Sequence, residues 1–176
     1  IMQDILTRAQ RYETFVRIDM ESSAYTDITL KMFDDRLFPA YKANVGVVLQ
    51  SYLRRTVADA HALADLEPNV RLCKGIYAEP PELAFPDFDA VRTNFVEALD
   101  ALLDASAYVG IATHDEWLIQ RGLERVQGLA REAYEFQTLL GVRPGRAAEL
   151  VAEGHRLRVY VPFGREWYQY SLRRLQ

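Results

Sequence analysis

A phenol and two guanidinium groups occur close together near the end of the chain. Tyr170, Arg173 and Arg174 follow a strand-like run that breaks at Phe163, and residues three and four apart lie on one face of a helix. One interpretation is a solvated helix end, since arginine suits the negative end of the helix dipole. The other is a clamp for a carboxylate or phosphate, because the planar guanidinium fork matches those anions.

Polar residues also stand at the carboxyl ends of most strand-like runs. They are Asp19, Gln50, Arg71 with Lys74, Thr113 with His114, Gln137 and Tyr160. In a (β/α)8 barrel the catalytic residues come from the C-terminal ends of several strands. The distribution therefore favours an active site at the mouth of such a barrel, although a loop acid or helix cap is the simpler interpretation of Asp19.

Arg71 and Cys73 alternate along one strand-like run and therefore share a face. A guanidinium inside a barrel is costly unless an anion lies beside it, and Asp19, an acidic ligand or an electron-rich cofactor could each supply one. Gln50 is either a satisfied polar residue or a partner for an amide-bearing ring. We expect Cys73 to be a small buried apolar residue rather than a nucleophile, and the bare backbone at Gly75 could approach a ligand.

The three histidines are far apart in the sequence. His61 lies mid-helix and His155 just before a strand-like run, so we expect surface or packing roles rather than metal ligation. His114 follows an apolar strand and opens a helix, where it could donate to a ligand. The sequence contains no Walker A loop, H-E-x-x-H, paired-cysteine or G-x-S-x-G motif.

Strand-like and helix-like segments alternate along the chain, at the period of parallel βα units. The strand-like runs are residues 15–19, 45–50, 70–74, 108–113, 134–140 and 157–161. The helix-like stretches are residues 26–38, 53–66, 91–103, 117–129 and 147–152. We interpret residues 1–176 as one domain, because no linker or low-complexity tract interrupts this period.

Two architectures fit parallel βα units, a doubly wound sheet and a (β/α)8 barrel. No G-x-G-x-x-G turn is present, which argues against the first. The second needs eight strands and about 250 residues. We therefore predict a distorted (β/α)8 barrel, with a seventh strand at residues 83–85 and one more strand upstream of residue 1. Residues 1–13 resemble a helix already under way, which suggests a lost N-terminal part.

The composition excludes some classes of protein. The 176 residues carry a net charge of −4 and a pI of about 5.4, which argues against a nucleic-acid binder that depends on phosphate contacts. Apolar runs are far shorter than the roughly 20 residues of a membrane span, and no signal peptide opens the chain. Because Cys73 is the single cysteine, no intramolecular disulfide can form, which fits the cytosol.

Six stretches together resemble proline dehydrogenase of the monofunctional bacterial type, a family of FAD enzymes. They are RIDMES, VGVVLQSYLRR, RLCKGIYAEP, ATHD, YEFQTLLGVRP and RVYVPFGREWYQYSLRRL, in the order of the family. The resemblance implies FAD at the barrel mouth and oxidation of L-proline to 1-pyrroline-5-carboxylate. It also implies transfer of electrons to a quinone, and a cytoplasmic enzyme that can associate peripherally with the inner face of the membrane.

The resemblance also implies roles for individual residues. Asp19 and Arg71 match the active-site aspartate and the arginine beside flavin N5. The expected flavin neighbours are Met20, Gln50, Lys74, Gly75, Ile76, Thr113 and His114. The expected proline-binding residues are Tyr160 and Tyr170, with Arg173 and Arg174 for the carboxylate. The family has a further strand upstream that carries a lysine, and no segment before residue 15 of this sequence resembles that strand. The family also has a glutamate in the last helix, which would fall just after Gln176.

Two rival functions remain open from the sequence. One is another barrel enzyme, such as a lyase or aldolase that binds phosphate after its late strands. The other is a flavin-binding but inactive fragment. Flavin absorption would argue against the first, and bleaching of that absorption by proline would argue against the second.

Overall fold

The computed structural model describes residues 1–165 and residue 168. Six parallel strands form one sheet. They are β1 (Val16–Arg17), β2 (Val45–Gln50), β3 (Asn69–Cys73), β4 (Tyr108–Ala112), β5 (Tyr134–Leu139) and β6 (Leu157–Tyr160). These are the six strand-like runs of the sequence, and β1 is the one that is much shorter than predicted.

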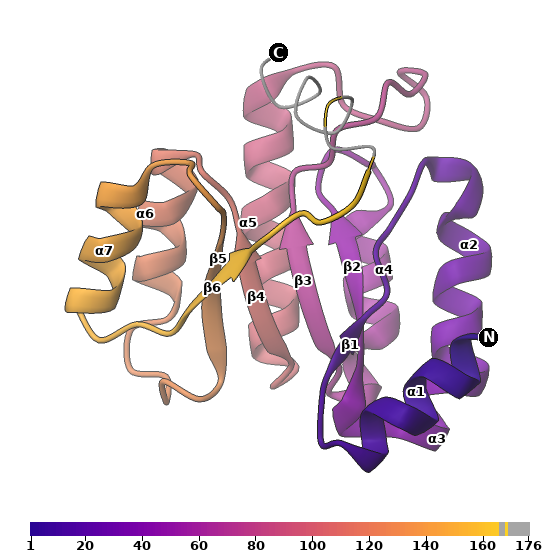
Figure 1. The fold of residues 1–176 in the computed structure, drawn as a ribbon. Helices are drawn as coiled ribbons and strands as arrows, with labels where there is room; N and C mark the ends of the chain where they lie inside the picture. Colours follow the sequence, from indigo (N-terminus) through magenta and orange to yellow (C-terminus); the bar gives the residue numbers. More distant parts are fainter. Residues whose placement is uncertain (166–167, 169–176) are drawn as a thin grey trace.

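The strands lie in the sheet in the order in which they occur in the chain, from β1 to β6. A doubly wound sheet reverses its strand order at a switch point, so the sequential order excludes that architecture. The sheet curls into an open half-barrel (Figure 1). Its convex face lies under the helices, and its concave face lines the interior.

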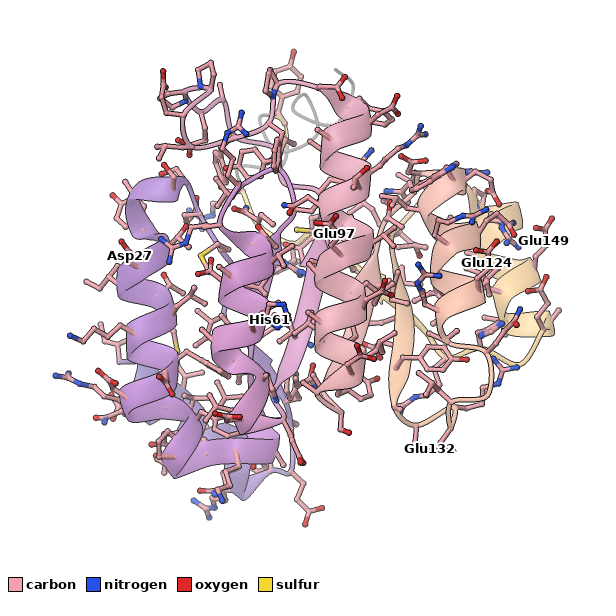
Figure 2. All side chains as sticks on the ribbon, turned by 180° about the vertical axis from the view of Figure 1, so that it is seen from behind. Asp27, His61, Glu97, Glu124, Glu132 and Glu149 are labelled. Atoms are coloured by element: carbon pink, nitrogen blue, oxygen red, sulfur yellow. The ribbon has the colours of Figure 1, made fainter. Side chains whose placement is uncertain are left out.

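Helix α1 (Met2–Arg11) precedes β1 and lies beside α3 at the lower end in Figure 1, and the helices that follow the strands cover the convex face. These are α2 (Ser23–Met32), α3 (Phe38–Tyr41), α4 (Thr56–Leu63), α5 (Phe88–Asp104), α6 (Glu116–Arg125) and α7 (Pro144–Ala152). A π-helical turn, Phe33–Leu37, joins α2 to α3, and 3-10 turns occupy Lys42–Asn44 and Ala64–Leu66. Seen from behind, Asp27, His61, Glu97 and Glu124 lie on the outer surface of these helices (Figure 2).

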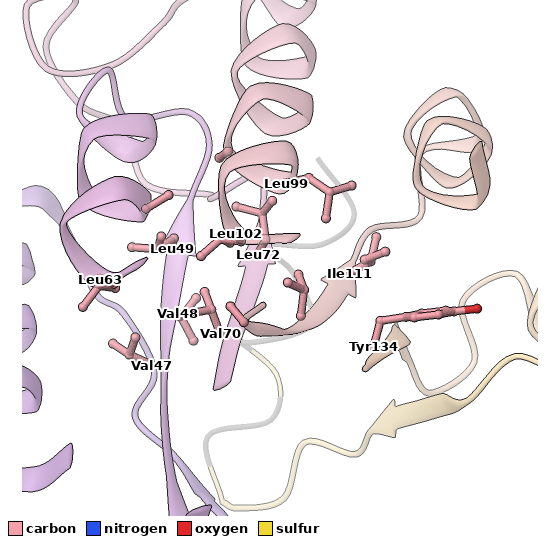
Figure 3. Packing of buried hydrophobic residues seen from close by; sticks show 14 of the residues in the cluster. Val47, Val48, Leu49, Leu63, Val70, Leu72, Leu99, Leu102, Ile111 and Tyr134 are labelled. Carbon is pink, nitrogen blue, oxygen red and sulfur yellow. The ribbon is translucent and has the colours of Figure 1, made fainter. Parts of the chain in front are cut away.

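The hydrophobic core lies between the convex face and the helices. Val47, Val70 and Leu72 of the sheet pack against Leu63 of α4 and Leu99 of α5, as Figure 3 shows, and none of the five is more than 4% exposed. In β3 the convex residues Val70 and Leu72 are fully buried, and the alternate residues face the concave side. This period of two follows from the pleat of a strand.

Several predicted boundaries are wrong. Residues 83–85 form no strand: Ala84 makes only an isolated antiparallel bridge to Leu53, because Pro80, Pro81 and Pro86 cannot donate to a ladder. The helix predicted at residues 26–38 begins earlier and is interrupted by the π-helical turn, and α6 ends four residues before Leu129. Among the described residues, no helix combines the length and the apolar character needed to cross a membrane.

Candidate active site

A cavity of about 500 Å³ opens at the carboxyl ends of the strands. Ten of the residues to which the sequence assigned a role line it together. They are Asp19, Met20, Gln50, Arg71, Lys74, Gly75, Ile76, Thr113, His114 and Tyr160. These residues lie on or just after five of the six strands, all except β5, and are as much as 141 positions apart, from 19 to 160. The other three, Tyr170, Arg173 and Arg174, lie outside the described residues.

Eight further residues line the cavity. They are Glu21, Val48, Cys73, Tyr77, Ala112, Gln137, Thr138 and Leu139. Gln137 is one of the polar strand ends from which the sequence predicted an active site, and the other seven were not predicted. Cys73 could have been found from strand alternation, since it occupies a concave position of β3. Tyr77 and Glu21 could not, because they lie in loops, where no periodicity predicts the direction of a side chain.

Arg71 and Asp19 form an ion pair at the cavity wall. A guanidinium nitrogen of Arg71 donates to the Asp19 carboxylate, and the two side chains are 19% and 51% exposed. The Tyr160 ring lies 5.9 Å from the Arg71 guanidinium carbon, within the range of a cation–π interaction. The carboxylate and the ring therefore hold a planar cation in place against the cavity.

A second charge network forms the floor beneath the cavity. Glu135 is 2% exposed and accepts two hydrogen bonds from Arg158, at 2.5 and 3.0 Å, and one from the Gln137 amide at 2.7 Å. Burial alone would raise the pKa of Glu135, but the hydrogen bonds and the charge of Arg158 outweigh it and hold the pKa below its usual value. The carboxylate is therefore ionised and accepts only.

The Gln137 side chain crosses the concave face directly over Gly110. A Cβ at Gly110 would lie 2.3 Å from the Gln137 amide nitrogen. A larger residue at position 110 would therefore push the Gln137 amide off Glu135.

Arg17 lies deeper in the concave face, one layer below Arg71. Its guanidinium donates to the carbonyls of Val47 (3.0 Å) and Asn69 (2.8 Å) and to the Asn69 side chain (2.5 Å). Burial, together with the charge of Arg71, lowers the pKa of Arg17 to about 10. The guanidinium remains charged at neutral pH, so it adds a fixed positive charge below the cavity.

Gln50 presents an unsatisfied acceptor at the cavity. Its Oε1 is buried and, within the described part of the chain, has no hydrogen-bond partner, while its amide nitrogen lies 3.4 Å from the Met20 carbonyl. A buried polar atom without a partner is uncommon and costs free energy. Because the side chain lines the cavity, an N–H or O–H group of a ligand could satisfy it.

His114 is a neutral imidazole with a defined tautomer. The Leu139 backbone N–H donates to its Nε2 at 2.9 Å, which leaves the proton on Nδ1. Burial, and then the charges of Arg143 and Lys74, lower the pKa of His114. His61 and His155 do not line the cavity: His61 is exposed on α4, and the His155 ring packs edge-on to Phe136 of β5.

Lys74 lies where the cavity meets α6. Its ammonium is 3.4 Å from Asp115 and 4.2 Å from the centre of the Phe88 ring. Asp115 also caps α6 through the Trp117 N–H and accepts two hydrogen bonds of 2.9 Å from Arg92. Burial alone would raise the pKa of Asp115, but Arg92 and Lys74 outweigh it and lower that pKa. The single Asp115 carboxylate therefore pairs with two cations, Lys74 and Arg92, so this wall of the cavity carries a net positive charge.

Comparison with known proteins agrees with the sequence resemblance. The family model described as "Proline dehydrogenase" matches residues 1–176.

The chain belongs to the proline dehydrogenase family.

Among its relatives is proline dehydrogenase of Deinococcus radiodurans, which is 40% identical over 173 residues, or 97% of this chain and 56% of the relative. Proline dehydrogenase 2 of Bacillus subtilis is 39% identical over 176 residues, or 99% of this chain and 57% of the relative. The chain thus spans little more than half the length of these members of the proline dehydrogenase family.

Solved structures of other proteins share the fold. The proline utilization A protein of Bdellovibrio bacteriovorus, inactivated by N-propargylglycine, has a TM-score of 0.89 at 24% identity, over 99% of this chain and 21% of its own. That of Bradyrhizobium japonicum has a TM-score of 0.86 at 24% identity, over 99% and 20%. At this identity the likeness concerns the fold alone, and it agrees with the curled parallel sheet.

Proposed function

We propose that the protein oxidises L-proline to 1-pyrroline-5-carboxylate with FAD as its cofactor and passes the electrons to a quinone. This would be the first step of proline catabolism to glutamate. The observation that carries the proposal is that ten residues matched to the family's site surround one cavity, in a chain that the family model covers from end to end. We further propose that the half-barrel is part of a distorted (β/α)8 barrel of one domain, in a cytoplasmic enzyme that associates peripherally with the membrane.

The cavity fits a flavin by its donor set. The unpaired Gln50 oxygen suits a ring that carries an imide N–H, and the charged Arg71 and Lys74 suit an electron-rich ring with a phosphate-bearing chain. The residues that would hold FAD are Met20, Gln50, Arg71, Lys74, Gly75, Ile76, Thr113 and His114. When bound, FAD would supply the acceptor for the hydride of the substrate.

The protein's own residues position the substrate and stabilise charge. Arg71 places a fixed positive charge where negative charge would develop as electrons arrive, and such preorganised electrostatics lower the barrier. Asp19 keeps the Arg71 guanidinium in one orientation through their ion pair. Tyr160 would bound the proline ring on one side of the cavity.

The substrate carboxylate needs cations of its own. On the strength of the sequence match, we assign this role to Arg173 and Arg174, with Tyr170 closing the proline site. A pair of guanidiniums fixes a carboxylate in one orientation, which is how positioning accelerates a transfer.

A spectroscopic experiment tests the proposal. The purified full-chain protein should show flavin absorption bands, and anaerobic L-proline should bleach them, whereas D-proline serves as the matched control. Protein without flavin would point to the lyase or aldolase alternative. Flavin bands that proline fails to bleach would point to a flavin-binding protein without this activity.

A further inference from the structure

Two loops at the cavity mouth have no regular structure of their own. The first, residues 18–22, carries Asp19 and Met20, and the second, residues 74–87, carries Lys74 and its neighbours. The first loop leaves a strand of only two residues, and its last sheet hydrogen bond runs from Ile18 N–H to Gly46 at 2.9 Å. The ladder therefore ends just before Asp19.

Glu79 joins the second loop to Ser23, the first residue of α2, directly after the first loop. Its Oε1 accepts from the Ser23 backbone N–H at 2.7 Å, and its Oε2 accepts from the Ser23 hydroxyl at 2.6 Å. Ser22, the residue at the start of α2, makes no capping hydrogen bond with its side chain. A carboxylate from 56 positions away thus caps α2, where the helix dipole favours negative charge.

Neighbouring contacts hold Glu79 in place. The Tyr52 hydroxyl lies 3.5 Å from the Glu79 carboxylate. The Tyr52 ring packs on Gly75, where φ is +96° and a Cβ would lie 2.1 Å from the ring. Two residues before Glu79, the Tyr77 hydroxyl donates to Glu21 of the first loop. The second loop is therefore held at two points, to Glu21 of the first loop and to Ser23 at the start of α2.

We propose that Glu79 is a positioning residue that acts through Asp19, by fixing the first loop so that the Asp19 carboxylate meets Arg71. The part about catalysis rests on the proposed oxidation of proline. The hydroxyl and N–H of Ser23 keep the pKa of Glu79 below its usual value, so the tie is intact at neutral pH. The alternative is a helix cap that stabilises α2 and has no effect on the site.

Hydrogen exchange of the full-chain protein tests the tie itself. In Glu79→Ala, backbone amides of residues 18–25 should exchange about tenfold faster, the effect of losing about 1.4 kcal/mol of charge-assisted hydrogen bonding. Glu79→Gln keeps an acceptor for the Ser23 N–H and should lie between Glu79→Ala and the parent protein. Glu82→Ala, an exposed acid of the same loop, is the matched control. Unchanged exchange of residues 18–25 in Glu79→Ala would overturn the tie.

A double-mutant cycle with Asp19 tests the catalytic part. Glu79→Ala should lower kcat/KM for proline about tenfold in the parent protein but less than twofold in Asp19→Asn, because its effect passes through Asp19. A merely structural cap would lower kcat/KM by the same factor in both backgrounds, which would overturn the positioning role. Faster exchange in a protein that never oxidises proline would support the tie and contradict the proposed function instead.

Discussion

The two faces of the sheet differ most clearly in β3 and β5. In β5, the convex residues Tyr134 and Phe136 are buried among apolar side chains, while Glu135 and Gln137 on the concave face form a charged network. Both faces share one backbone, and along β5 the even-numbered residues Tyr134 and Phe136 face one side while the odd-numbered Glu135 and Gln137 face the other. A slip of one residue in register would exchange the faces, so the alternation also fixes the register.

The comparison separates two uses of burial. The convex face removes apolar surface from water, and any well-packed side chain of the right volume serves that purpose. The concave face buries charged groups, which costs free energy unless each group has a hydrogen-bond or ion-pair partner. Only specific residues can be that partner. Changes on the convex face should therefore alter stability, and changes on the concave face should alter chemistry.

The largest effect should come from the convex face. Leu72 is fully buried in the core, and Leu72→Ala should lower the free energy of unfolding by about 2–5 kcal/mol through lost transfer energy and the cavity left behind. Urea denaturation measures this loss. The kcat/KM of the folded variant should stay within about twofold of the parent value. A tenfold loss would contradict the idea that changes on the convex face alter stability and not chemistry.

The charge network beneath the cavity should give the next largest effect on stability, and the loss should depend on which partner is replaced. Arg158→Met leaves the buried Glu135 without its cation and should cost about 2–3 kcal/mol, whereas Glu135→Gln leaves an arginine that is 55% exposed and can turn to water. Urea denaturation of both variants checks the order. Equal losses would mean that burial of Glu135 has no energetic consequence.

At the cavity wall, replacing a residue should lower catalysis and leave stability nearly unchanged. Arg71→Met removes the charge that the proposal assigns to electron transfer, and kcat/KM for proline should fall about 10- to 150-fold, the equivalent of roughly 1.5–3 kcal/mol. Because the ion pair with Asp19 is part-exposed, the melting temperature should change little. Steady-state kinetics, with bound flavin checked by absorbance, measures the fall in kcat/KM. A large drop in melting temperature would contradict the prediction that the ion pair contributes little to stability.

The same distinction explains what the sequence could predict. Six strands and the concave direction of Arg71 and Cys73 follow from apolar runs and from alternation, which are local. The residues at strand ends, such as Gln50 and His114, could be expected at one site because parallel strands bring their carboxyl ends together. Glu79 could not, because its partner lies 56 positions away and loops have no period that directs a side chain.

The smallest effect should come from protonation of His114 at the cavity. Its pKa is lowered by burial and by the nearby cations, so the unfolded chain binds this proton more tightly than the folded protein does. Stability therefore falls as the pH drops through the unfolded value, about 6.5. His114→Gln should therefore lose less unfolding free energy than the parent protein between pH 7.5 and pH 5. Urea titrations at both pH values measure the difference. If His114→Gln had the same profile as the parent, neither burial nor the cations around the cavity would act on His114, and the positive character assigned to this wall would be wrong.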